Sequence, residues 1–403
     1  MKAYERFLKY VKFDTKSCEE NANCPSSEGQ IVFAKKLVEE MKEIGIVNVK
    51  LDDNGYVYGE IPASSGRESE KAIGLIAHMD TAPVVTGTYV KPRIVTNYDG
   101  GNILLNEKLG VVINADDYPE IREYVGQSLI VTDGTTLLGA DDKAGIAEIL
   151  TASQKIIKEN LSHPAIKIAF TPDEEIGRGA DLFDVEGFGA DYAYTIDGGK
   201  LGELEYENFN AASANIRING NCIHPGEGKN KMKNAILIAM EFNGMLPASE
   251  IPAHTEGYEG FYHIMNVEGT EEKATLDYIV RDHSMEKFEA RKNTIIRIVD
   301  YLNEKYGAGT IEYNLTDSYY NMKEKILPHM EIINKAEEAF RKNGVEPITT
   351  PIRGGTDGAR LSYMGLPCPN LSTGGHNFHG RYEYIPVESM DKMVDVILSL
   401  ICD

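Results

Sequence analysis

Five short polar clusters in this 403-residue sequence carry the side chains that bind metal ions or transfer protons. They lie at residues 77–80, 139–143, 171–175, 196–199 and 374–380. Carboxylates and imidazoles without thiolates suit Zn²⁺, Mn²⁺ or Co²⁺. Two such ions about 3.5–4 Å apart, sharing a bridging carboxylate, can clamp a water and a substrate carbonyl. The clusters together therefore indicate hydrolysis at a pair of metal ions.

Taken one at a time, the clusters have plainer explanations. The paired aspartates Asp141 and Asp142 precede a predicted helix and would cap it well. Asp197 stands before two glycines and suits a turn. His78 and Asp80 are two residues apart and so share one face of a strand, where one can bind a metal while the other accepts the second imidazole N–H. Only the presence of all five clusters together favours a catalytic site. The H-E-x-x-H, Walker and G-x-S-x-G motifs of other enzyme classes are absent.

The elements that must position these side chains are strands of a mostly parallel sheet. Short apolar runs predict strands at 56–61, 72–77, 165–170 and 191–196, alternating with helices at 31–44 and 142–158. We interpret four of the five clusters as following strands. Because the carboxyl ends of parallel strands share one edge, where ligands bind, distant side chains would converge there. A capping box at Ser27 and Gln30 is expected to open the first helix.

A second, smaller domain is predicted within the first. Strands and helices expected at 212–219, 231–246, 261–268, 273–281, 285–306 and 310–316 follow the order β-α-β-β-α-β. This order is the ferredoxin-like motif. We therefore expect an α/β catalytic domain at 1–208 and 319–403 with an inserted α+β lid at 209–318. Residues 86–131 are expected to form loops and hairpins.

The composition of the sequence argues against nucleic-acid and membrane partners. The sequence has 41 Lys and Arg against 63 Asp and Glu, a formal charge of −22 that argues against nucleic acid. Five scattered cysteines favour neither a disulfide framework nor a thiolate zinc site. No apolar run is long enough to span a bilayer, and the charged N-terminus is unlike a signal peptide. We expect a cytoplasmic protein without membrane or nucleic-acid partners.

The clusters resemble those of the co-catalytic zinc metallopeptidases of the aminoacylase and carboxypeptidase G2 type, and most closely the bacterial tripeptide aminopeptidases of that family. The resemblance runs end to end and includes residues 26–30, 135–145, 173–177 and 353–358, with a long insertion after Asp80. It implies release of the N-terminal residue from short peptides, with tripeptides as the expected substrates.

The resemblance also implies a role for each ligand candidate. Asp141 would bridge two divalent metal ions, most simply Zn²⁺. His78 and Asp197 would complete one site, and Glu175 and His379 would complete the other.

Two further carboxylates would act beside the ions. Asp80 would orient His78, and Glu174 would be the general base that activates the water. In this family the peptide bond between Asp141 and Asp142 is cis.

Three residues outside these clusters are expected to contact the substrate. The resemblance implies that His224 from the lid donates to the tetrahedral oxyanion, either in its own subunit or in a partner's, since many relatives dimerise through this domain. Arg281 and Arg353 carry guanidinium forks suited to a substrate carboxylate. The plainer explanation is a loop histidine and two surface ion pairs.

Two other functions remain open on sequence grounds. An N-acyl amino acid amidohydrolase or dipeptidase would use the same scaffold, although the long insertion after Asp80 argues against it. A non-catalytic peptide-binding protein would be expected to lack Glu174 or a metal ligand, and all are present.

Overall fold

The computed structural model describes residues 1–403 and divides into two compact units. The first comprises Met1–Tyr206, Glu324–Thr350 and Thr356–Asp403, and the second comprises Glu207–Lys323 and Pro351–Gly355. The second unit thus also includes the short segment Pro351–Gly355, which was predicted to belong to the last part of the catalytic domain. The reason is local: Ile352 N donates to Glu207 O, and the Arg353 guanidinium donates to the carbonyl oxygens of Gly257 and Glu259.

The first unit is built on an eight-stranded sheet of order β1-β2-β8-β3-β9-β16-β10-β15. The strands are β1 (Val47–Leu51), β2 (Val57–Ile61), β8 (Ile166–Thr171), β3 (Ile73–His78), β9 (Tyr192–Ile196), β16 (Asn370–Leu371), β10 (Glu203–Glu205) and β15 (Ile348–Thr349). The pairs β8·β3, β3·β9 and β9·β16 are parallel, while β1·β2, β2·β8 and β10·β16 are antiparallel. The predicted α/β sheet, parallel at its centre, is confirmed.

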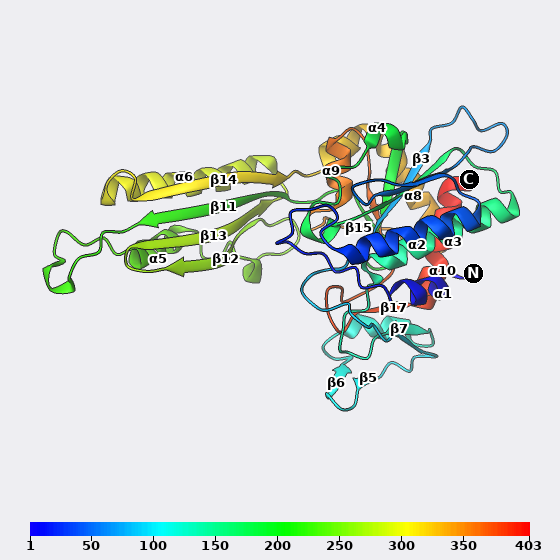
Figure 1. Ribbon diagram of the computed structural model, residues 1–403, viewed down its shortest axis with the longest axis horizontal. Coiled ribbons are helices and arrows are strands. Elements are labelled where there is room, and N and C mark those ends of the chain that lie inside the picture. The colour runs from blue at the N-terminus through cyan, green and yellow to red at the C-terminus, as the bar shows by residue number, and fades with distance from the viewer. The chain divides into compact units, whose positions relative to one another are not determined.

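Helices pack against this sheet and against one another. They are α1 (Ala3–Tyr10), α2 (Glu28–Ile44), α3 (Ala140–Glu159), α4 (Val185–Phe188), α7 (Lys323–Ile326), α8 (Met330–Lys342), α9 (Asp357–Tyr363) and α10 (Val387–Cys402). Figure 1 shows α2 and α3 side by side, and α3 contacts β3, β9, α1 and α10. The N-terminus of α3 is thereby brought to the strands that carry the polar clusters.

The predicted capping box of α2 is wrong. Ser27 precedes the helix but accepts no capping hydrogen bond. The Gln30 amide is engaged elsewhere, because its Nε2 donates to Asp173 Oδ1 at 2.7 Å and its Oε1 accepts from Asp173 N at 3.1 Å. The residues that looked like a helix signal instead fix the start of α2 to the segment that carries Glu174.

The region after Asp80 forms loops and short paired strands, in agreement with the predicted loops and hairpins. Its strands are β4 (Arg93–Val95), β5 (Ile103–Asn106), β6 (Val111–Ile113) and β7 (Leu129–Val131), with a 3-10 turn at Pro119–Tyr124. β5 pairs with β6, and β7 lies between β4 and β17 (Tyr384–Pro386). Buried Ile113, Ile121 and Tyr384 share one apolar cluster. The insertion therefore packs against the C-terminal segment of the chain.

The second unit is a four-stranded antiparallel sheet of order β12-β13-β11-β14 with two helices. Its elements are β11 (Asn210–Asn219), α5 (Ala235–Met245), β12 (Phe261–Gly269), β13 (Lys273–Asp282), α6 (Met285–Tyr306) and β14 (Ile311–Tyr319). The predicted ferredoxin-like order is confirmed. Helix α5 begins four residues later than predicted, because the Asn234 side chain caps it by accepting from Leu237 N.

All five cysteines are unpaired, in keeping with the absence of a disulfide pattern in the sequence. None of the helices combines the length and the apolar character that crossing a membrane requires.

One buried carboxylate should make the stability of the first unit depend on pH. Glu148 on α3 is fully buried, and neither of its carboxylate oxygens has a hydrogen-bond partner in the protein. Burial raises its pKa well above the ordinary value of 4.5. The folded protein therefore holds a proton on Glu148 that the unfolded chain releases, so the contribution of Glu148 to stability is greatest below pH 4.5 and is lost as pH rises through its folded pKa.

We predict that Glu148→Gln stabilises the protein at pH 7 and has little effect near pH 4. The difference should grow by about 1.4 kcal/mol for each pH unit above the unfolded pKa until the folded pKa is reached. Urea unfolding across this pH range measures it, with Glu159→Gln at the exposed end of the same helix as control. A pH-independent difference would show that Glu148 is not the group responsible.

Candidate active site

Three of the polar clusters lie along one edge of the central sheet. His78 is the last residue of β3, Asp197 directly follows β9, and Glu174 and Glu175 follow the end of β8 at Thr171. Strands β8, β3 and β9 are adjacent and parallel, so their carboxyl ends coincide. The predicted convergence at this edge is found for these three clusters.

The fourth cluster, residues 139–143, does not follow a strand of the central sheet, so this prediction is wrong. The preceding strand, β7, ends at Val131 and belongs to the separate three-stranded sheet. Asp141 lies instead at the start of α3, with the non-helical angles φ −85° and ψ 104°. The peptide bond between Asp141 and Asp142 is cis, as the family resemblance implies.

Asp141 contacts both histidines. Its Oδ1 lies 2.9 Å from His78 Nε2, and its Oδ2 lies 3.0 Å from His379 Nε2. His78 Nε2 is also 3.6 Å from Asp197 Oδ1, and His379 Nε2 is 3.0 Å from Glu175 Oε2. The five side chains thus form two three-residue groups, within each of which the ligand atoms lie within 4.8 Å of one another, and Asp141 belongs to both.

The charges in these groups are tightly interdependent. Hydrogen bonds to Asp141 and Glu175 raise the pKa of His379 to about 11. Burial, followed by the charge of Asp141, raises the pKa of Glu175 to about 7 and that of Asp197 to about 6. Burial alone would lower the pKa of His78, but Asp197 and the other carboxylates outweigh it and raise that pKa. So many carboxylates in one buried place require cations among them.

The donor set fits two divalent metal ions. Each group offers one imidazole nitrogen and two carboxylates, one of them shared, which is a ligand type that Zn²⁺, Mn²⁺ and Co²⁺ accept. The shared carboxylate presents a separate oxygen to each histidine, as a bridging ligand must. No cysteine belongs to either group.

Asp80 supports both sides of this arrangement. It is fully buried; its Oδ1 lies 3.3 Å from His78 Nδ1, and its backbone oxygen lies 3.1 Å from the same nitrogen. The same carboxylate accepts from Glu174 N at 3.0 Å and from Glu175 N at 3.2 Å. One side chain therefore orients a histidine and fixes the backbone of the two adjacent glutamates.

Glu174 belongs to neither ligand group, although its neighbour Glu175 does. Burial raises its pKa well above the ordinary value; the charge of His78 opposes this rise, and the charges of Asp197, Asp357 and Glu175 add to it. A carboxylate with raised proton affinity beside the ligand groups is suited to accept and return a proton.

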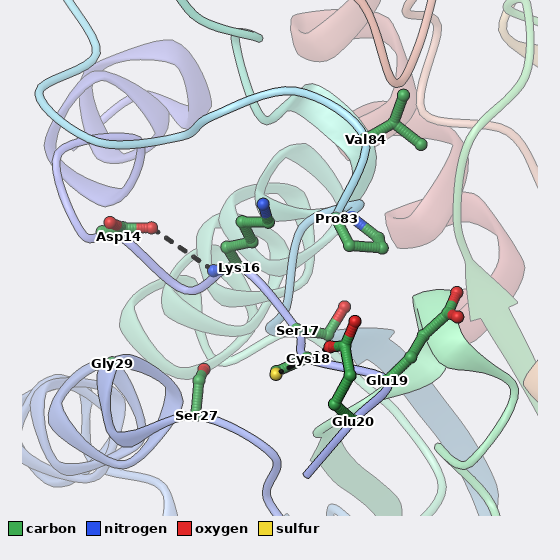
Figure 2. A pocket seen from close by; sticks show the side chains of 10 residues that line it. All are labelled: Asp14, Lys16, Ser17, Cys18, Glu19, Glu20, Ser27, Gly29, Pro83 and Val84. Atoms are coloured by element: carbon green, nitrogen blue, oxygen red, sulfur yellow. Dashed lines mark hydrogen bonds between the residues drawn. The ribbon is translucent and has the colours of Figure 1, made fainter.

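A polar pocket of about 580 Å³ adjoins these segments. Figure 2 shows Glu19 and Glu20 below Pro83 and Val84, with Asp14 and Lys16 at the other end. Several contacts join this pocket to the site; among them, Ser17 N donates to Thr81 O at 3.1 Å, and Arg178 Nη2 donates to Glu19 O at 2.9 Å. Thr81 follows Asp80, and Arg178 lies in the loop that follows Glu175.

The other three predicted site residues lie in the second unit. His224 is exposed, and its Nδ1 accepts from Gly226 N at 3.2 Å. Arg353 uses both terminal nitrogens to donate to backbone carbonyls of residues 255–259. Arg281 Nη1 donates to Arg353 O at 3.0 Å, while its buried Nε has no partner in the protein.

Two buried carboxylates that hold the active-site segments were not predicted from the sequence. Asp173 accepts from Ser26 N, Ser26 Oγ and the Gln30 amide. Glu383 accepts from the backbone N–H groups of residues 138–141. A sequence signal existed for Asp173, which stands beside Glu174, but none distinguished Glu383 from a surface glutamate.

Comparison with known proteins agrees with this arrangement. A family model described as "Peptidase family M20/M25/M40" matches residues 132–403. A protein named peptidase T from Halothermothrix orenii is 59% identical over 401 residues, covering 99% of this chain and 98% of its own. Another peptidase T, from Caldanaerobacter subterraneus subsp. tengcongensis, is 55% identical over 401 residues, with the same two coverages.

A solved structure extends the likeness to three dimensions. The aminopeptidase PepT from Bacillus cereus has a TM-score of 0.79 and 25% identity, covering 99% of this chain and 97% of that one. Together with the family model and the full-length relatives, it leaves one assignment: the chain belongs to peptidase family M20/M25/M40.

Proposed function

We propose that the chain is a two-metal aminopeptidase that releases the N-terminal residue from short peptides, with tripeptides as the preferred substrates. The single observation that carries this proposal is the pair of ligand groups sharing Asp141, with Glu174 beside them but outside both. The full-length relatives named peptidase T support the same activity.

We assign two zinc ions to these groups. His78 and Asp197 would hold one ion, Glu175 and His379 would hold the other, and Asp141 would bridge them. When bound, such ions polarise a substrate carbonyl and lower the pKa of a bound water to about 7.

The protein's own groups then carry the proton. Glu174 accepts a proton from the attacking water and returns one to the leaving amine. Asp80 holds the Glu174 and Glu175 backbone in place through its two carboxylate oxygens. Because Asp80 also faces His78, loss of this carboxylate would disturb the base and a ligand together.

Substrate ends are assigned from charge. The acidic pocket lined by Asp14, Glu19 and Glu20 suits the protonated amino terminus of a peptide, since Lys16 is the one basic residue among its lining residues. Arg281, with an unpartnered buried Nε, is the better candidate for the substrate carboxylate. We assign Arg353 to ordering the loop at residues 255–259, because backbone carbonyls of that loop accept from its guanidinium. We assign His224 to donating to the oxyanion.

We further propose that the protein is cytoplasmic and forms a homodimer through the second unit. Strand β12 is an edge strand that pairs with β13 alone. Exposed apolar side chains lie on it and on α5: Met265 and Val267 are each 59% exposed, Leu237 is 63% and Met240 is 64% exposed. An unpaired edge beside apolar surface is a site for pairing with a second copy.

Replacing Glu174 with Gln should lower kcat by about 10²- to 10⁴-fold, the range for losing a general base. The variant should still bind two ions, because Glu174 belongs to neither ligand group. Steady-state kinetics with metal analysis measures both quantities. Near-normal kcat would contradict the role of Glu174, whereas loss of metal would mean that it is a ligand.

A substrate panel separates the proposed activity from the amidohydrolase and dipeptidase alternative, which the full-length relatives do not favour. Free tripeptides should be hydrolysed faster than di- and tetrapeptides, and N-acetylated tripeptides should be poor substrates. A blocked amino terminus cannot carry the charge that the acidic pocket suits. Equal cleavage of free and acetylated tripeptides, or preference for N-acetyl amino acids, would overturn the assignment.

The proposed dimer is tested by introducing a charge on the exposed apolar surface of α5 and β12. Met240→Glu should convert a dimer into a monomer, because a carboxylate would be buried there without a partner. Leu109→Glu is the matched control, since Leu109 is 62% exposed but lies in the first unit. Light scattering over a range of protein concentrations gives the mass. A monomeric wild type, or a dimer that survives Met240→Glu, would refute this interface.

A further inference from the structure

Glu383 is a buried carboxylate to which the proposed chemistry gives no role. It is 1% exposed and accepts four hydrogen bonds from successive backbone N–H groups. Oε2 accepts from Leu138 N at 2.6 Å and Gly139 N at 2.8 Å, and Oε1 accepts from Ala140 N at 2.7 Å and Asp141 N at 3.2 Å. The last of these donors belongs to the residue whose side chain both histidines contact.

Local backbone conformation makes this convergence of donors possible. Gly139 has φ +82° and ψ 31°, in the left-handed region that a residue with a Cβ adopts only with strain. Successive N–H groups around such a residue form a concave anion-binding nest. The same segment stands just before the regular part of α3, which begins after the non-helical residues Asp141 and Asp142. The nest therefore suits a carboxylate such as that of Glu383.

The loop that carries Glu383 also carries His379. Its ends are joined by hydrogen bonds from His376 N to Tyr384 O at 2.9 Å and from Tyr384 N to His376 O at 3.1 Å. Tyr384 continues into β17, which pairs with β7. Glu383 thus joins a closed loop bearing one ligand candidate to the backbone of another, Asp141, although the two segments are more than 200 residues apart in the chain.

We propose that Glu383 is a positioning residue for the metal site: by holding the 138–141 backbone, it fixes the Asp141 carboxylate against His379. This inference rests on the proposed two-metal function. A misplaced bridging carboxylate would weaken the binding of both ions at once, because it is the ligand that they share. Glu383 itself contacts neither substrate nor ions and acts only through Asp141 and the loop of His379.

The direct test is Glu383→Gln in the full chain. The amide keeps the shape but replaces one acceptor oxygen with a donor, so two of the four N–H groups lose their partner. We expect Zn²⁺ to bind about 10- to 100-fold more weakly, the usual cost of losing a group that orients metal ligands. Chelator competition with Zn²⁺ measures this. We also expect kcat to fall more than KM changes, because the substrate contacts remain.

A matched control separates positioning from general destabilisation. Arg6 is another buried charged residue, and it donates to Thr151 and Gln154 well along α3 from Asp141. Arg6→Gln should lower the thermal unfolding temperature without weakening Zn²⁺ binding. Glu383→Asp, which keeps the charge on a side chain one methylene shorter, should give an intermediate loss of Zn²⁺ affinity and decides the question if the glutamine variant does not fold.

The outcomes distinguish two failures. If the wild-type protein binds no Zn²⁺, the proposed two-metal function is wrong. If the wild type binds two ions and the Glu383 variants bind them within about twofold of wild type, the function stands and the positioning role is overturned. If Arg6→Gln and Glu383→Gln weaken Zn²⁺ binding equally, Glu383 has a structural role only and the positioning role is likewise overturned.

Discussion

The carboxylate of Asp141, placed between the imidazoles of His78 and His379, is the contact on which the active site depends. Around it lie Asp197 and Glu175, whose pKa values rise to about 6 and about 7 because burial and the charge of Asp141 oppose their ionisation. Such a group of acids is stable only with positive charge among them, whether protons on histidine or bound metal ions.

The rest of the first unit can be understood as the means of holding these charges together. Parallel strands β8, β3 and β9 bring three segments to one edge, and α3 delivers Asp141 from its N-terminus. Buried carboxylates that belong to neither ligand group hold the segments: Asp80 fixes the two glutamates, and Glu383 fixes the Asp141 backbone. The geometry of this metallo-aminopeptidase site therefore depends on buried anions that accept backbone N–H groups.

Some of this arrangement was predictable from sequence because strands and ligands were adjacent in the chain. An apolar run ending in His78, or ending shortly before Glu174, shows both the strand and the residue placed at its edge. The β-α-β-β-α-β order of the second unit was predictable for the same reason: each element carries its own periodicity. Family resemblance supplied the pairing of ligands, which spacing alone leaves open.

The errors arose where a residue's role depends on a distant partner. Gln30 looked like part of a capping box, but it bonds to Asp173. The cluster of Asp141 was expected to follow a strand of the central sheet, but the preceding strand β7 belongs to another sheet. Other contacts could not be predicted at all: Arg353 donates to carbonyl oxygens nearly a hundred residues earlier, Glu383 accepts from N–H groups more than 200 residues earlier, and no local pattern encodes either contact.

Anomalous diffraction at the zinc edge, from crystals of the wild-type protein grown with Zn²⁺, would locate the metal ions around Asp141. We expect two peaks about 3.5–4 Å apart, one on each side of the Asp141 carboxylate. One peak should contact His78 and Asp197, and the other Glu175 and His379. A single peak, or a pair of peaks that does not share Asp141, would contradict the proposed two-metal site.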